Sequence, residues 1–141
     1  MVLTLQWLFL RLTKFAYLIK SFEAVQNVAS SGKICILDID IQGAKRVKEG
    51  GDGNSCSIQP YFIFISPPSL EILEARLRDR GTETEEAIRR RIGNAAKEIE
   101  YGTTNGNFDE IVVNDDLEQA FIRLRHILEE WYPHLQQVPS N

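Results

Sequence analysis

Hydrophobic and polar residues follow one another along this chain in blocks that predict strands separated by helices. Short apolar runs predict three strands, over 34–39, 61–65 and 110–114. Apolar residues at helical spacing predict helices over 21–30, 41–50, 70–79, 80–102 and 115–132. Because strands that alternate with helices form βαβ units, we predict an α/β fold with a parallel sheet and flanking helices.

Local patterns add detail to these elements. The run 34–39 is apolar without alternation, which predicts a strand buried on both faces, as in a parallel sheet. Thr82, with Glu85 three residues later, resembles a capping box at the start of a long charged helix. In the last helix, the apolar stripe that we expect to face the core consists of Leu117, Ala120, Phe121, Leu124 and Leu128.

The first 20 residues are much more apolar than the rest of the chain. Arg11 and Lys14 interrupt them before they reach the roughly 18–20 residues that a membrane span needs, so we predict no membrane span. We expect this segment to cover a core. The predicted organisation is therefore an apolar segment over 1–20, one domain over 21–132 and a tail over 133–141.

Composition and charge exclude some classes of function. A hydrophobic content of 43% with 26% charged residues is ordinary for one globular domain. The net charge of -4 provides no basic field, so we predict no nucleic-acid partner. Cys35 and Cys56 do not have the spacing of a zinc site, and both histidines lie far from them, so we assign no metal ligands. Reduced cysteines without a targeting segment predict a cytoplasmic protein.

Candidate chemistry lies just after the predicted strands, because ligands of parallel α/β sheets bind at the carboxyl ends of the strands. Asp38 and Asp40 end the first strand, and Asn114 and Asp115 follow the third. Two carboxylates at alternate strand positions point to one side, which suits a hydrated Mg²⁺ ion or hydrogen bonds from a base or ribose. The alternative is that the aspartates cap the next helix.

Two further patterns concern phosphate binding. Six arginines flank the GTETEE turn at 81–86, and most are expected to face solvent beside glutamates, while a phosphate clamp is the functional alternative for one or two. The string SSGK at 30–33 looks like the end of a phosphate loop. However, it leads into a strand rather than a helix, so we reject that interpretation and read Gly32 as a helix cap.

Three strings occur in the order and spacing of one enzyme family. GKICILDIDIQGAKRVK, IFISPPSLEILEARLRDRGTETEEAIRRRI and IVVNDDLEQAF resemble successive blocks of guanylate kinase, in the part of the family domain nearer its carboxyl terminus. The resemblance covers 21–131. It implies a partial P-loop kinase fold, with three recognisable strands and a lid, and the reaction ATP + GMP to ADP + GDP with Mg²⁺.

The resemblance also implies residue roles. Arg80 and Arg91 match the two catalytic arginines that clamp the phosphates, and the segment between them matches the lid. Asp38 and Asp40 match the acidic pair on the GMP side. A third pair, Asn114 with Asp115, matches the adenine side of the ATP pocket.

Parts of the family pattern do not occur in these 141 residues, namely the glycine-rich phosphate loop and the arginine-bearing GMP-binding region. We therefore expect the chain alone to be inactive as a kinase. The alternatives are a non-catalytic binding or regulatory module, with a protein partner at an exposed sheet edge or at the N-terminal segment, and a truncated splice or gene-model product. We also hypothesise that residues 2–10 take the place of the absent central strand.

Overall fold

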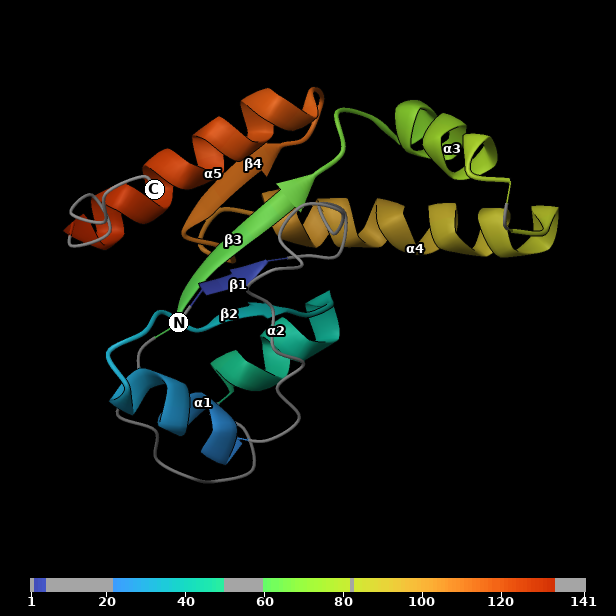
Figure 1. Ribbon diagram of the computed structural model, residues 1–141. Coiled ribbons are helices and arrows are strands. Elements are labelled where there is room, and N and C mark those ends of the chain that lie inside the picture. The colour runs from blue at the N-terminus through green and yellow to red at the C-terminus, as the bar shows by residue number, and fades with distance from the viewer. Residues whose placement is uncertain (1, 5–21, 50–59, 82, 134–141) are drawn as a thin grey trace.

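The computed structural model describes residues 2–4, 22–49, 60–81 and 83–133, and within these ranges four parallel strands form one sheet (Figure 1). The strands are β1 (Val2–Thr4), β2 (Ile36–Asp38), β3 (Tyr61–Ser66) and β4 (Glu110–Val113). Their order across the sheet is β2-β1-β3-β4, and every neighbouring pair is parallel. The predicted α/β fold with a parallel sheet is confirmed.

Strand β1 lies in the middle of this sheet. Val2 is in register with Ile36 of β2 on one side and with Tyr61 of β3 on the other. The hypothesis that the beginning of the chain supplies a central strand is therefore confirmed for residues 2–4, while residues 5–10 lie outside the described part of the chain.

Helices cover both faces of the sheet. They are α1 (Phe22–Ser30), α2 (Ile41–Lys48), α3 (Leu70–Asp79), α4 (Glu85–Thr103) and α5 (Leu117–Trp131). Figure 1 shows α5 over one face of β3 and β4, with α2 and one end of α4 on the other face. Helices α3 and α4 lie side by side beyond the strand ends and share a small apolar core of their own. Among the described residues, none of the helices has the length and apolar character needed to cross a membrane.

The alternation of side chains along β3 builds two cores. Ile63 and Ile65 pack with Val112 against α5, where Ala120 and Leu124 meet them. On the opposite face, Phe62 packs with Ala44 of α2, and Phe64 packs with Ile41. All of β3 except Tyr61 is buried, as expected for a strand with helices on both faces.

Helix α4 approaches β3 very closely at Gly102. A Cβ atom at this position would lie 2.4 Å from the ring of Phe64, well inside contact distance. The absence of a side chain therefore permits the end of the long helix to rest on the sheet. This contact connects helix α4 to strand β3.

Two local predictions are wrong. The strand predicted over 34–39 is not buried on both faces: β2 lies at the edge of the sheet, its first two residues are half-buried, and Asp38 is exposed. Helix α4 is capped by Thr84, whose hydroxyl accepts from the N–H of Ala87 at 3.3 Å, rather than by a capping box from Thr82. The first difference comes from the place of β2 in the sheet, which a short sequence pattern does not contain.

The apolar stripe predicted for the last helix is confirmed in part. Ala120 and Leu124 are buried and Leu128 packs against the same core, whereas Leu117 and Phe121 are 40% and 39% exposed. Ile127, which the prediction did not include, is buried with Ala120 and Leu124. Cys35 is a buried free cysteine, and burial raises the pKa of its thiol.

Candidate functional site

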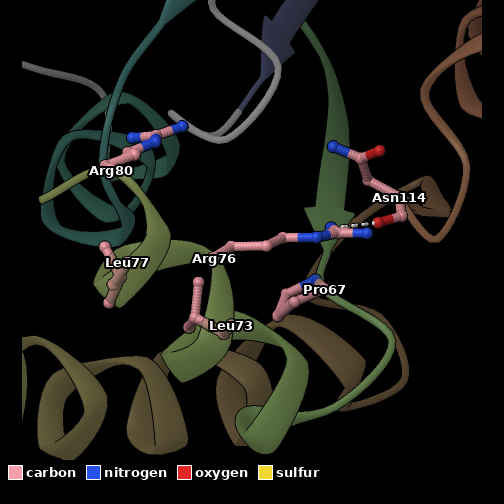
Figure 2. A pocket seen from close by; sticks show the side chains of 6 residues that line it. All are labelled: Pro67, Leu73, Arg76, Leu77, Arg80 and Asn114. Atoms are coloured by element: carbon pink, nitrogen blue, oxygen red, sulfur yellow. Dashed lines mark hydrogen bonds between the residues drawn. The ribbon is translucent and has the colours of Figure 1, made fainter.

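A pocket lies between helix α3 and the carboxyl ends of β3 and β4 (Figure 2). Its lining combines apolar side chains with two guanidinium groups and one amide: Pro67, Leu73, Arg76, Leu77, Arg80 and Asn114. This is the edge of a parallel sheet at which ligands are expected, and the residues come from segments almost 50 positions apart.

Helix α3 supplies most of the lining. It begins at Ser69, whose hydroxyl accepts from the N–H of Ile72 at 3.2 Å, and it packs on α4 through Leu73 and Leu77. Arg76 and Arg80 are four residues apart, so they lie on one face of the helix. Gly81 then takes a φ of 62°, which ends the helix directly after Arg80.

The end of β4 supplies the amide. The N–H of Asn114 donates to the carbonyl of Ser66 at 2.7 Å, which extends the pairing of β3 and β4 by one step. Asn114 is only 8% exposed. Two residues later, the carboxylate of Asp116 accepts from the N–H of Gln119 at 2.9 Å and starts α5. The loop between strand and helix is therefore tied down at both ends.

Arg76 is a pocket residue to which the sequence reasoning assigned no role. Its Nη1 donates to the carbonyl of Asn114 at 2.7 Å, and its Nη2 donates to the carbonyl of Asp115 at 2.6 Å. Figure 2 shows the side chain extended from α3 to the end of β4. Its position one helical turn before Arg80 was the available signal, since that spacing gives the two arginines one face.

The structure brings some of the predicted site residues together. Arg80 and Asn114 both line the pocket, although 34 positions separate them in the sequence. The side chain of Asp115 is exposed and is not among the lining residues, while its carbonyl receives the bond from Arg76. Arg91 is also outside the lining, and its Nε lies 3.0 Å from a carboxylate oxygen of Glu83.

The predicted acidic pair lies on the other side of the sheet, after β2. Asp40 caps α2, because its Oδ1 accepts from the N–H of Gly43 at 2.7 Å. The capping alternative therefore holds for this residue. Asp38 ends β2, and burial of part of its carboxylate raises its pKa. The pKa of Glu98 on α4 is raised first by burial and then by the charge of Asp40.

Metal-binding side chains are not grouped in the described ranges: no three or more of His, Cys, Asp or Glu are arranged there to hold an ion. Magnesium ions that act on nucleotides are commonly held by the phosphates together with only one or two carboxylates. We assign no step to a metal ion here.

This chain is similar to known proteins of one family. The chain matches the guanylate kinase family over residues 7–131. It is 49% identical over 108 residues to "Guanylate kinase 1" of Oryza sativa subsp. japonica, which covers 77% of this chain and 27% of that protein. It is 41% identical over 110 residues to the guanylate kinase of Sus scrofa, which covers 78% of this chain and 52% of that protein.

A crystal structure of guanylate kinase from Anaplasma phagocytophilum superposes on 99% of this chain and 86% of its own, at 21% identity and a TM-score of 0.48. The chain thus spans about half or less of the curated relatives named above. The family match begins inside the apolar segment, at residue 7, and the domain boundary at residue 21 stays a prediction. The cytoplasmic location and the protein partner also stay predictions.

Proposed function

Because this chain belongs to the guanylate kinase family, we propose that its pocket binds ATP, for the transfer of a phosphoryl group to GMP. One observation supports this proposal most directly: Arg80 and Asn114, to which the family resemblance gives the phosphates and the adenine, line the same pocket. The other predicted roles, of Arg91 and of the acidic pair, belong to the same proposal.

The pocket residues have the chemistry that such a ligand requires. The guanidinium of Arg80 has donors that match phosphate oxygens in pairs, and its position at the end of α3 leaves it exposed. The Asn114 side chain has both donors and an acceptor, which suits the edge of a base. Pro67 and the two buried leucines give an apolar wall for a flat ring.

Arg91 would act as the second clamp after the lid moves. Its ion pair with Glu83 is half exposed on the arginine side, and ion pairs of this kind contribute little, roughly 0–1 kcal/mol. A phosphate group can therefore replace Glu83 as the partner of Arg91 at small cost. We assign Asp38 to the binding of GMP, the acceptor of the phosphoryl group.

We also propose that these 141 residues by themselves have low kinase activity. They contain no Gly-x-x-x-x-Gly-Lys-Ser/Thr sequence, so they have no phosphate loop to provide backbone donors, a lysine and a metal-binding hydroxyl together. In related enzymes, loss of a single transition-state cation costs on the order of 10³ or more in rate. We expect ATP binding without turnover of GMP at a kinase rate.

Two measurements on the purified chain test this proposal. Calorimetric titration with ATP is expected to show binding that Arg80→Ala weakens by at least about tenfold, since a charge-assisted pair is lost. Arg125→Ala is the matched control, because Arg125 lies on α5 and pairs with Glu129. Absence of ATP binding would contradict the pocket assignment. GMP phosphorylation at about 1–100 s⁻¹ in a coupled assay would contradict the low activity.

A further inference from the structure

One side chain bridges the two halves of the pocket. Arg76 on α3 donates to the carbonyls of two consecutive residues, Asn114 and Asp115, which follow it by 38 and 39 positions. Both bonds are short, at 2.7 and 2.6 Å, and one of them is partly buried. A planar guanidinium makes such a pair of bonds in a fixed orientation, so the loop after β4 is held at a defined distance from the helix.

The helix that carries this bridge is itself well supported. Leu73 and Leu77, on either side of Arg76, are buried against Ile88 and Ala95 of α4. Arg80 ends the same helix one turn later. The backbone position of Arg80 and the anchor of the Asn114 loop are therefore both set by α3.

We propose that Arg76 is a positioning residue, which holds the amide of Asn114 in a fixed relation to Arg80. In this arrangement helix α3 sets the distance between Asn114, which contacts the base, and Arg80, which contacts the phosphates. The inference rests on the proposed function, because it assigns a role to Arg76 in the same ATP pocket. Arg76 acts through its hydrogen bonds to the backbone carbonyls of the loop and does not contact the phosphates.

The first test needs no ligand. Amide hydrogen exchange is measured on the unliganded chain with Arg76→Ala and with Arg76→Lys. Both variants are expected to speed exchange at Gln119 and Ala120, whose N–H groups are bonded to Asp116 at the end of the loop, by roughly tenfold or more. Arg76→Lys is expected to speed exchange as well, because one ammonium group does not reproduce the pair of hydrogen bonds that the guanidinium makes.

The matched control lies two residues further along the same helix. Arg78 is exposed and pairs with Glu74 and Glu85, outside the pocket. Arg78→Ala is expected to leave exchange at Gln119 and Ala120 within twofold of the original protein. Unchanged exchange at these two amides in Arg76→Ala would overturn the proposed bridge.

The second test separates a positioning role from a direct phosphate contact. Affinities for ATP, adenosine and tripolyphosphate are compared in the original chain, Arg76→Ala and Arg80→Ala. We expect Arg76→Ala to weaken ATP and adenosine by about tenfold and to leave tripolyphosphate within twofold. Arg80→Ala is expected to show the opposite order, with the larger loss for tripolyphosphate.

The outcomes are distinguishable. Equal loss of tripolyphosphate and adenosine in Arg76→Ala would overturn the inference and would make Arg76 a phosphate ligand. If the original chain binds none of the three ligands, the proposed function fails and the assignment to an ATP site fails with it. The exchange data then still decide whether Arg76 orders the loop, independently of any nucleotide.

Discussion

The two halves of the sheet differ in how firmly they hold the residues assigned to the site. Five of the six residues of β3 are buried, and this half positions Asn114 and Arg80 in one pocket. Strand β2 has only three residues, of which the last, Asp38, is exposed. The difference shows that two apolar runs of similar sequence can be buried to very different extents, depending on the elements that pack against them.

The reason lies in the place of each strand in the sheet. Strand β3 has neighbours on both sides and helices on both faces, so its side chains are excluded from water. Strand β2 lies at the edge, and in the described part of the chain it joins the sheet through the three residues of β1. Substitutions in the two halves should therefore have unequal effects.

The largest effect is expected in the core of β3. Ile65→Ala removes a side chain with 0% exposure and should lower the free energy of unfolding by about 2–5 kcal/mol through lost burial and a cavity. Ile36→Ala in β2 removes a half-buried side chain and should cost about 1 kcal/mol. Urea unfolding of both variants measures the difference, and equal losses would refute the distinction between the halves.

A proline in β1 tests the link between the halves. Leu3→Pro removes one backbone N–H from a strand that pairs on both sides, with an expected loss of about 1–3 kcal/mol. Hydrogen exchange should accelerate at the amides of β2 more than at those of Ile63 and Ile65. Uniform acceleration across the sheet would instead mean that the two halves open together.

Gly102 provides a test on the firmer half. Gly102→Ala places a Cβ atom 2.4 Å from the ring of Phe64 and should destabilise the chain by about 1–3 kcal/mol. Gly93 is the control on the same helix, since its Cβ would meet nothing within 4 Å. Gly93→Ala should stabilise by about 0.5–1 kcal/mol. Thermal unfolding distinguishes the two, and a neutral Gly102→Ala would contradict the close approach of α4.

The role of Asp40 as a cap is tested by two substitutions. Asp40→Ala should cost about 0.5–2 kcal/mol of stability, because the N–H of Gly43 loses its acceptor. Asp40→Asn keeps a capping oxygen and should cost less than about 0.5 kcal/mol. Chemical unfolding measures both. Equal costs for the two variants would show that the charge of Asp40 matters more than its hydrogen bond.

The smallest effect concerns pH, at the place where the charge of Asp40 acts on helix α4. Burial, and then the charge of Asp40, raise the folded-state pKa of Glu98. The folded chain therefore holds this proton more tightly than the unfolded chain, so the stability from Glu98 is present at low pH and is lost as pH rises through the raised pKa. Glu98→Gln should be slightly more stable than the original chain at neutral pH and indistinguishable below the ordinary pKa of Glu98.

Urea unfolding at a series of pH values checks this expectation. A stability difference between Glu98→Gln and the original chain that stays constant across the series would show that Glu98 does not titrate differently in the folded state.

Much of the architecture is predictable because its signals are local. Helical spacing of apolar residues located α3 at 70–79, as the structure has it. The apolar run 61–65 located β3 to within one residue. The strings around Arg80 and Asn114 also predicted both as site residues; both line the pocket, and their roles stay predictions.

What the sequence by itself determined is therefore the kind of each element, the α/β class and the family to which the chain belongs. Only the tertiary structure decided that α5 leaves Leu117 and Phe121 exposed and that Arg76 reaches the loop after β4. These features depend on which segments meet across many positions of sequence. Periodicity and local propensity act within a few residues and carry no information about such meetings.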